Sequence, residues 1–203
     1  MNSDEFHIFS MACQQFKEEV SLITPIDWEK PGLGNWDVKS LVGHAFRALT
    51  TLENYLEGTA PSSKTLKNAA SYFIIANLSD PKVNEGIEKR GIESAQMLGD
   101  DPISKIEESI SKVDSLLLSV DSHTLLNTPF GAMDILDYLD TRSFELVVHS
   151  LDISKVISRS IKFKTELLNF VWKLLGEIAI EKGICEDLLL NITGREVALQ
   201  SIF

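Results

Sequence analysis

Residues 141–153 read Thr-Arg-Ser-Phe-Glu-Leu-Val-Val-His-Ser-Leu-Asp-Ile. This largely apolar run predicts a helix in which Arg142, Glu145, His149 and Asp152 are separated by three, four and three residues. Side chains three and four residues apart stack on one face of a helix, so these four form one continuous row. Such a row is normally apolar and faces the core, whereas every member of this one is ionisable.

The remaining faces of the same helix limit where the row can point. Apolar side chains cover the opposite face and flank the row: Phe144, Leu146, Val147, Val148, Leu151, Ile153 and Val156. The other polar strip is narrow and consists of Ser143, Ser150 and Ser154. If these serines face water, the charged row points inward, where charges must be paired or bind a metal. A salt-bridge network with His149 as a satisfied neighbour is the structural alternative.

Composition and charge restrict the class of protein. A chain of 203 residues with 44% hydrophobic and 24% charged residues fits one globular domain, or one domain with an appendage. Its net charge of −11 argues against a surface that binds nucleic acid, because phosphate contacts need basic patches. An anionic membrane surface would also repel it. We therefore expect neither nucleic acid nor membrane as a partner.

Targeting signals and cysteine usage point to the cytoplasm. The chain has no apolar run near the roughly 18 residues that span a bilayer, and its start lacks the pattern of a signal peptide. Cys13 and Cys185 lie far apart, and Cys13 falls on an apolar helical row that favours packing over chemistry. We predict a soluble, cytoplasmic protein without structural disulfides.

Helical periodicity recurs along the chain and predicts an all-α fold. The four best helices lie near residues 4–23, 37–57, 102–120 and 140–157, with Asp37 as an N-cap. Segments 64–77 and 83–98 are weaker helices, and a loop passes through Pro129 and Gly131. We predict a four-helix bundle over residues 1–160, with a C-terminal helix and short tail, 161–203, packed on it. Gly183 is expected to cap that helix.

A metal site is one interpretation of the ionisable row. Glu145 and His149 are four residues apart, so both side chains can reach one ion. His44, on the second predicted helix, borders its apolar face and could add a third ligand from a facing helix. Three protein ligands leave a position open, as in catalytic zinc sites. The alternative for His44 is a histidine at the core edge satisfied by a carbonyl, and Trp36 is interpreted as a hydrophobic staple.

Three segments resemble one known family. The run Pro31-Gly-Leu-Gly-Asn-Trp-Asp-Val-Lys-Ser-Leu-Val-Gly-His44 resembles the W-T/S-V-x-x-L-x-x-H opening of the maleylpyruvate isomerase N-terminal domain, a DinB-like, mycothiol-dependent metalloenzyme family. The run Asp137-Tyr-Leu-Asp-Thr-Arg-Ser-Phe-Glu-Leu-Val-Val-His-Ser-Leu-Asp152 is similar to its D-Y-L-x-T-R-x-F-E-L-x-V-H-x-L-D segment. Leu188-Leu-Leu-Asn-Ile-Thr-Gly-Arg195 is similar to its L-L-x-L-T-G-R ending.

This resemblance implies a DinB-like four-helix bundle with a divalent metal, usually zinc. By position, its ligands fall on His44, Glu145 and His149. It further implies a low-molecular-weight thiol of the mycothiol type, used in transferase or isomerase chemistry on a small molecule.

The resulting hypothesis is a metal-dependent, thiol-cofactor transferase or isomerase that acts on a small electrophile. Arg142 and Asp152 would orient the ligands and balance their charge. Arg195 would bind a carboxylate if the tail folds over the site; a surface arginine is the alternative. A metal-dependent hydrolase and a non-catalytic metal or small-molecule binding bundle remain open, as does a homodimer.

Overall fold

The structure is a computed structural model that describes residues 4–76 and 81–195. Within these ranges the chain forms eight helices and one β-hairpin. In chain order they are α1 (Asp4–Ser21), α2 (Val38–Leu56), α3 (Ala69–Ile75), α4 (Pro81–Met97), α5 (Pro102–Leu118), β1 (Leu125–Thr128), β2 (Gly131–Asp134), α6 (Ile135–Val156), α7 (Thr165–Lys182) and α8 (Cys185–Ile192).

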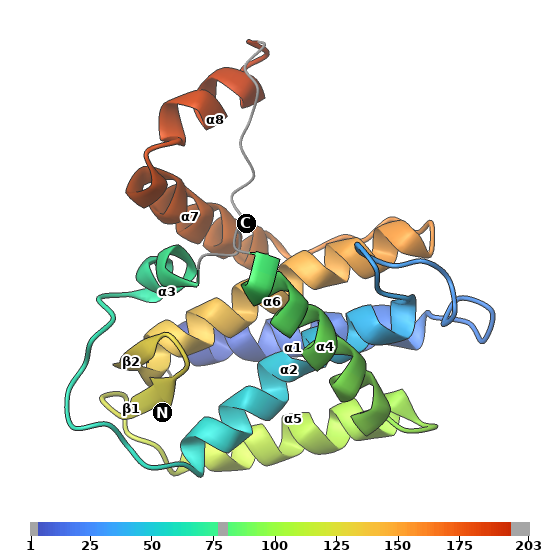
Figure 1. Cartoon of the computed structure of the whole chain (residues 1–203), viewed down its shortest axis with the longest axis horizontal. Coiled ribbons are helices and arrows are strands. Elements are labelled where there is room, and N and C mark those ends of the chain that lie inside the picture. Colours follow the sequence, from blue (N-terminus) through green and yellow to red (C-terminus); the bar gives the residue numbers. More distant parts are fainter. Residues whose placement is uncertain (1–3, 77–80, 196–203) are drawn as a thin grey trace.

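Helices α1, α2, α5 and α6 form the central bundle (Figure 1). Helices α1 and α2 each pack against both α5 and α6, so the four enclose one core. These are the four helices that the sequence predicts best, and the all-α bundle is confirmed. Helix α4 lies against α2, α7 packs against α3, α1 and α6, and α8 packs on α7.

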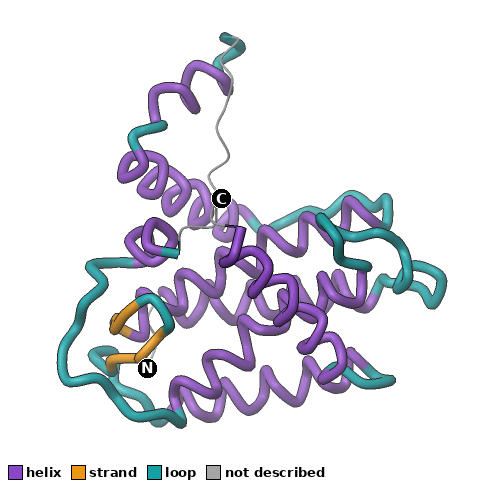
Figure 2. The backbone as a smooth tube through the Cα atoms, in the orientation of Figure 1, coloured by secondary structure: helices purple, strands orange, loops and turns teal. Residues whose placement is uncertain are grey.

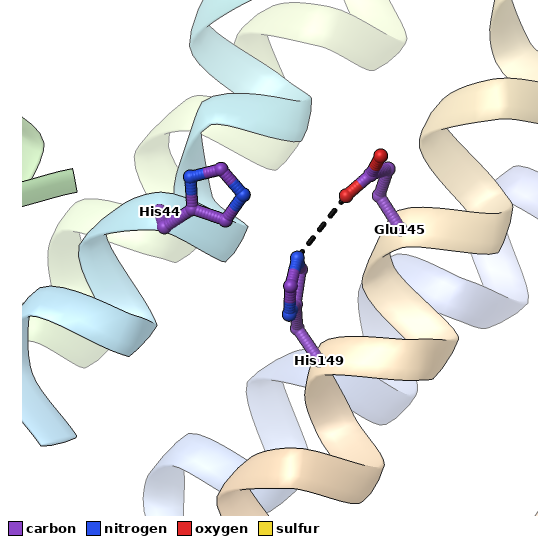
Figure 3. A group of neighbouring side chains, drawn as sticks. All are labelled: His44, Glu145 and His149. Carbon is purple, nitrogen blue, oxygen red and sulfur yellow. Dashed lines mark hydrogen bonds and ion pairs between the residues drawn. The ribbon is translucent and has the colours of Figure 1, made fainter. Parts of the chain in front are cut away.

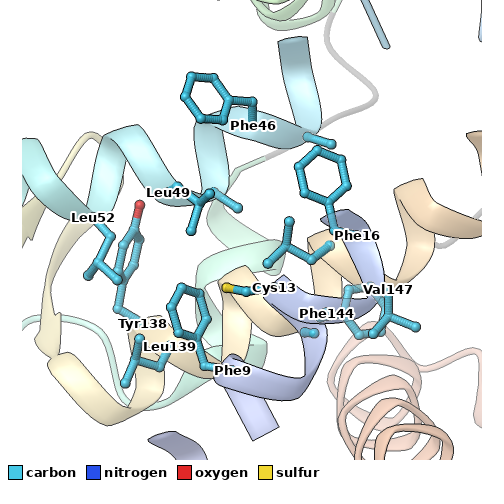
Figure 4. Packing of buried hydrophobic residues seen from close by; sticks show 14 of the residues in the cluster. Phe9, Cys13, Phe16, Phe46, Leu49, Leu52, Tyr138, Leu139, Phe144 and Val147 are labelled. Atoms are coloured by element: carbon cyan, nitrogen blue, oxygen red, sulfur yellow. The ribbon is translucent and has the colours of Figure 1, made fainter. Parts of the chain in front are cut away.

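Apolar rows of the bundle helices form the core, and Figure 4 shows the part of it contributed by α1, α2 and α6. Cys13 is buried among phenylalanines of α1 and has no disulfide partner, as its place on an apolar row predicts. The labelled core residues are Phe9, Cys13 and Phe16 from α1, Phe46, Leu49 and Leu52 from α2, and Tyr138, Leu139, Phe144 and Val147 from α6. This packing fixes α2 and α6 relative to each other, and these two helices carry the candidate site.

Local capping explains where the helices begin and end. The Asp37 carboxylate accepts a hydrogen bond from the Ser40 amide at 2.7 Å, which confirms it as the N-cap of α2. Gly183 has a φ of 68° and ends α7 in the left-handed conformation that glycine adopts without strain.

Two segments differ from the prediction. Over residues 64–77 only α3 is helical among the described residues, because Asn68 caps it and the amides of Thr65 and Leu66 donate instead to the Ala132 carbonyl. Residue 77 lies outside the described ranges. The predicted loop through Pro129 and Gly131 is an antiparallel hairpin (Figure 2), with Leu125 opposite Asp134. Four-residue strands are too short for alternation to be recognised in the sequence.

Small residues allow α4 to approach α2 closely beside the site. A Cβ atom on Gly43 of α2 would lie 2.4 Å from the Ala95 amide nitrogen of α4, and one on Gly91 would lie 2.8 Å from the Trp36 ring. The Trp36 indole N–H also donates to the Glu88 carbonyl at 3.1 Å. Trp36 thus fastens α4 to the loop that precedes α2.

The C-terminal part is more helical than predicted. Beyond α7, the segment expected to be a short tail contains α8, and its last residues, 196–203, lie outside the described ranges. Helix α7 packs on the bundle, whereas α8 packs on α7 and projects away from the bundle (Figure 1). Among the described residues, no helix has the length and apolar character needed to span a membrane.

Candidate metal centre

The ionisable row of α6 lines a cavity, as its spacing predicts. Arg142, Glu145, His149 and Asp152 all contribute to the wall of a cavity of about 380 Å³. His44 reaches the same cavity from α2. The site is therefore built on two helices whose relative position is fixed by the core, which favours accurate placement of ligands.

The three predicted metal ligands converge. One donor atom from each of His44, Glu145 and His149 lies within 4.8 Å of the other two. The two imidazole rings have centroids 4.8 Å apart and planes at 86°. In Figure 3, Glu145 and His149 rise from α6 and the Nε2 edge of His44 faces them from α2. Two imidazoles and a carboxylate form a donor set that suits zinc and similar divalent ions.

His149 makes hydrogen bonds through both ring nitrogens. Nε2 lies 3.1 Å from Glu145 Oε2, and Nδ1 lies 3.1 Å from Asp152 Oδ2. Burial favours the neutral ring, but the hydrogen bonds and charges of Asp152 and Glu145 outweigh it and raise the pKa of His149 to about 9. Burial likewise opposes the Glu145 carboxylate, yet His149 and Arg142 lower the pKa of Glu145 to about 2. Without metal, His149 and Glu145 therefore form a charged pair.

His44 behaves differently from His149. Burial first, and then the positive charge of His149, lower the pKa of His44 to about 3, so its ring is neutral at pH 7. Its Nδ1 atom is buried and has no hydrogen-bond partner in the described residues. The ring packs against Trp36, with centroids 4.6 Å apart. Packing rather than a hydrogen bond therefore holds His44, and its neutral ring has a lone pair available to an ion.

Arg142 sits between two aromatic rings. Its guanidinium carbon lies 5.2 Å from the centroid of Tyr72 and 4.9 Å from that of Tyr138. Burial opposes its charge, but Tyr138, Tyr72 and Glu145 outweigh this and keep the pKa of Arg142 above its usual value. Arg142 therefore stays cationic and offsets the negative charge of Glu145.

Aromatic and apolar side chains form most of the cavity wall. They come from the loop before α2, from α3, α4 and α6, and from the hairpin turn: Leu33, Trp36, Tyr72, Phe73, Ile87, Phe130, Phe144 and Val148. An apolar wall with a few convergent polar groups is typical of small-molecule sites.

One premise of the sequence argument is wrong. The serines expected to face water are buried, with exposed fractions of 0% for Ser143, 0% for Ser150 and 4% for Ser154. The hydroxyls of these three serines donate, in chain order, to the backbone carbonyls of Leu139, Leu146 and Arg159. These bonds satisfy the hydroxyls inside the bundle, so α6 has almost no solvated face, and the ionisable row faces the cavity instead.

Two further placements bear on the predictions. Arg195 follows α8, is exposed, and donates to the Thr193 carbonyl at 3.2 Å; it does not line the cavity. Its proposed role is thus not supported by its position.

Arg47 and Arg90 do line the cavity but were not singled out from the sequence. Arg47 is three residues after His44, and this spacing places both on the same face of α2, so the sequence could have predicted that Arg47 lies near the site.

The fold is similar to that of a solved structure, the crystal structure of the mycothiol-dependent maleylpyruvate isomerase. The TM-score is 0.59 at 15% sequence identity, over 85% of this chain and 67% of that chain. The chain shares the fold of that enzyme. This agrees with the predicted all-α bundle, and at this identity the likeness extends to the fold alone. No family model matches the chain, and no curated protein matches its sequence.

Proposed function

We propose that this protein is a metal-dependent enzyme that uses a low-molecular-weight thiol to transfer a group to, or isomerise, a small electrophilic molecule. The observation that carries the proposal is the convergence of His44, Glu145 and His149 within 4.8 Å on the wall of a cavity. The fold shared with a mycothiol-dependent isomerase supports the thiol part.

The donor set fits a zinc-type ion. The neutral ring of His44 is ready to ligate, and Glu145 brings a negative charge. Three protein ligands would leave room for an exogenous one. A divalent ion held there would lower the pKa of a bound thiol and so supply a nucleophile at neutral pH.

The chain's own residues would prepare the site for this chemistry. Asp152 accepts the hydrogen bond of His149 Nδ1, which fixes the ring orientation so that Nε2 points toward Glu145. Arg142 balances the carboxylate charge from its place between two tyrosines. The aromatic wall limits access of water and selects a small ligand.

The experiment measures metal content and thiol-dependent turnover together. Purified protein would be loaded with zinc and assayed with a panel of electrophiles, with and without mycothiol or a simpler cysteinyl thiol. We expect turnover that needs both metal and thiol, and that is lost in Glu145→Gln. The matched control is Glu107→Gln, an exposed carboxylate on α5.

Two results would contradict the proposal. Turnover of esters or amides without thiol would assign the same donors to a hydrolase, in which the metal would activate water. Metal binding with no turnover of any panel member, with or without thiol, would favour a non-catalytic binding bundle.

A further inference from the structure

Three arginines on three different helices line the same cavity. Arg47 comes from α2, Arg90 from α4 and Arg142 from α6. The whole chain has 19 basic and 30 acidic residues, so its average surface repels anions. The three arginines therefore give this cavity a local positive charge, opposite in sign to the net charge of the chain.

The three arginines lie at different depths. Arg90 is exposed, Arg47 is partly buried and Arg142 is 8% exposed. Arg142 is already engaged by two tyrosine rings and the nearby Glu145. In the described residues, neither Arg47 nor Arg90 forms an ion pair with a carboxylate. Their charges are therefore available to a ligand.

The charges of these arginines act on one another. Burial first, and then the charges of Arg90 and Arg142, lower the pKa of Arg47. Like charges held close together in a partly buried wall are unfavourable, and an anion placed between them relieves the repulsion. The arrangement therefore favours occupation by a negatively charged group.

We propose that Arg47 and Arg90 bind a carboxylate of the small molecule on which this protein acts. A guanidinium matches a carboxylate through two parallel hydrogen bonds, which makes arginine the preferred partner for this group. Because Arg47 follows His44 by one helical turn, a bound carboxylate would hold the rest of the ligand beside the three metal donors. The cavity of about 380 Å³ limits that ligand to a small molecule.

This inference rests on the proposed function for its catalytic meaning, but the binding site can be tested separately. Succinate is the probe, succinamide is its neutral counterpart, and inorganic phosphate is a second anion. Binding would be measured by calorimetry on chelator-treated and zinc-loaded protein. The variants are Arg47→Gln, Arg90→Gln and Arg47→Lys, with thermal melts to establish that each is folded.

Lys89→Gln is the matched control. It removes one positive charge from the residue adjacent to Arg90, but Lys89 is exposed, pairs with Glu93 at 3.8 Å and does not line the cavity. A general change of protein charge would affect both variants equally, whereas a specific site would respond only to Arg90.

We expect succinate to bind metal-free protein and succinamide not to bind. Arg47→Gln and Arg90→Gln should each weaken succinate at least about tenfold, Arg47→Lys should weaken it less, and Lys89→Gln should change it less than about twofold. This result would support the carboxylate site even if no metal-dependent turnover were found.

Several results would overturn the inference. Succinate binding that requires zinc and is insensitive to both arginine variants would place the carboxylate on the metal, which supports the proposed function but not this site. Equal losses in Arg90→Gln and Lys89→Gln would show a general charge effect. Binding of phosphate but not succinate, or of neither anion, would exclude a carboxylate site.

Discussion

The imidazole rings of His44 and His149 meet edge to face, with centroids 4.8 Å apart and planes at 86°. They come from α2 and α6, which pack against each other in the bundle. Perpendicular rings do not stack, so the ring nitrogens can be directed toward a shared point that the Glu145 carboxylate also reaches. The core packing of two helices thus determines the geometry of the candidate metal site.

Metal binding should depend on this pair. Replacing His149 with alanine removes one of three ligands, and we expect zinc affinity to fall by at least about 100-fold, since loss of an outer-shell partner alone costs 10–100-fold. Competition with a chromophoric chelator measures the change. His123→Ala is the control, because His123 is exposed and does not line the cavity. Equal, negligible metal in wild type and His149→Ala would reject the site.

Asp152 should tune the site without ligating. Its carboxylate lies 3.1 Å from His149 Nδ1, so Asp152→Ala removes the hydrogen bond that orients the ring. We expect zinc affinity to fall by about 10–100-fold, less than for His149→Ala, with the stoichiometry unchanged. The same chelator competition gives both quantities. Unchanged affinity would show that packing alone orients His149.

Helical periodicity was sufficient to predict the bundle and to place Glu145 and His149 together, whereas His44 was assigned as a third ligand through the family resemblance. The spacing of Glu145 and His149 places them on one face whatever the tertiary structure is. The prediction that this face points inward rested on the premise that the serines of α6 face water. That premise is wrong, because these serines are buried and donate to backbone carbonyls. Short polar side chains can satisfy themselves locally, so their presence does not mark a solvated face.

The rest of the cavity depends on contacts between segments distant in sequence. Phe130 reaches the wall from a hairpin turn, and Arg90 reaches it from α4. Trp36 was interpreted as a local staple, yet it packs on His44 and bonds to Glu88 of α4. No periodic pattern encodes such contacts, so they could not be predicted without the structure.

The contact between α4 and Trp36 should be sensitive to one methyl group. A Cβ on Gly91 would meet the rigid indole at 2.8 Å, so Gly91→Ala must displace Trp36 or α4. We expect a net loss of about 1–3 kcal/mol in the free energy of unfolding. Gly176→Ala is the control, because nothing lies within 4 Å of that position in α7, and alanine should stabilise the helix by about 0.5–1 kcal/mol. Urea unfolding distinguishes the two variants. Equal stabilisation by Gly91→Ala and Gly176→Ala would show that Trp36 can move aside without a loss in the free energy of unfolding.

The final prediction concerns Asp140, which lies on α6 among charged neighbours from α1 and α7. Burial first, and then the negative charges of Glu5 and Asp137, raise the pKa of Asp140 to about 7, with Glu177 adding to the effect and Lys173 opposing it. In the unfolded chain this carboxyl titrates near its ordinary value of about 3.9. Between these values the folded state holds a proton that the unfolded state has released. The free energy of unfolding should therefore fall as pH rises from about 4 to about 7.

Asp140→Asn should remove this dependence, because the amide keeps the shape of the acid without its charge. At pH 8 we expect the variant to be more stable than wild type by roughly 1–4 kcal/mol, and at pH 4 the two should be nearly equal. Urea unfolding at a series of pH values measures the difference. Asp100→Asn, at an exposed position after α4, controls for the loss of one negative charge from an acidic chain. A difference between Asp140→Asn and wild type that is the same at pH 4 and pH 8 would mean that folding does not raise the pKa of Asp140, since the two stabilities diverge with pH only if this pKa differs between the folded and unfolded states.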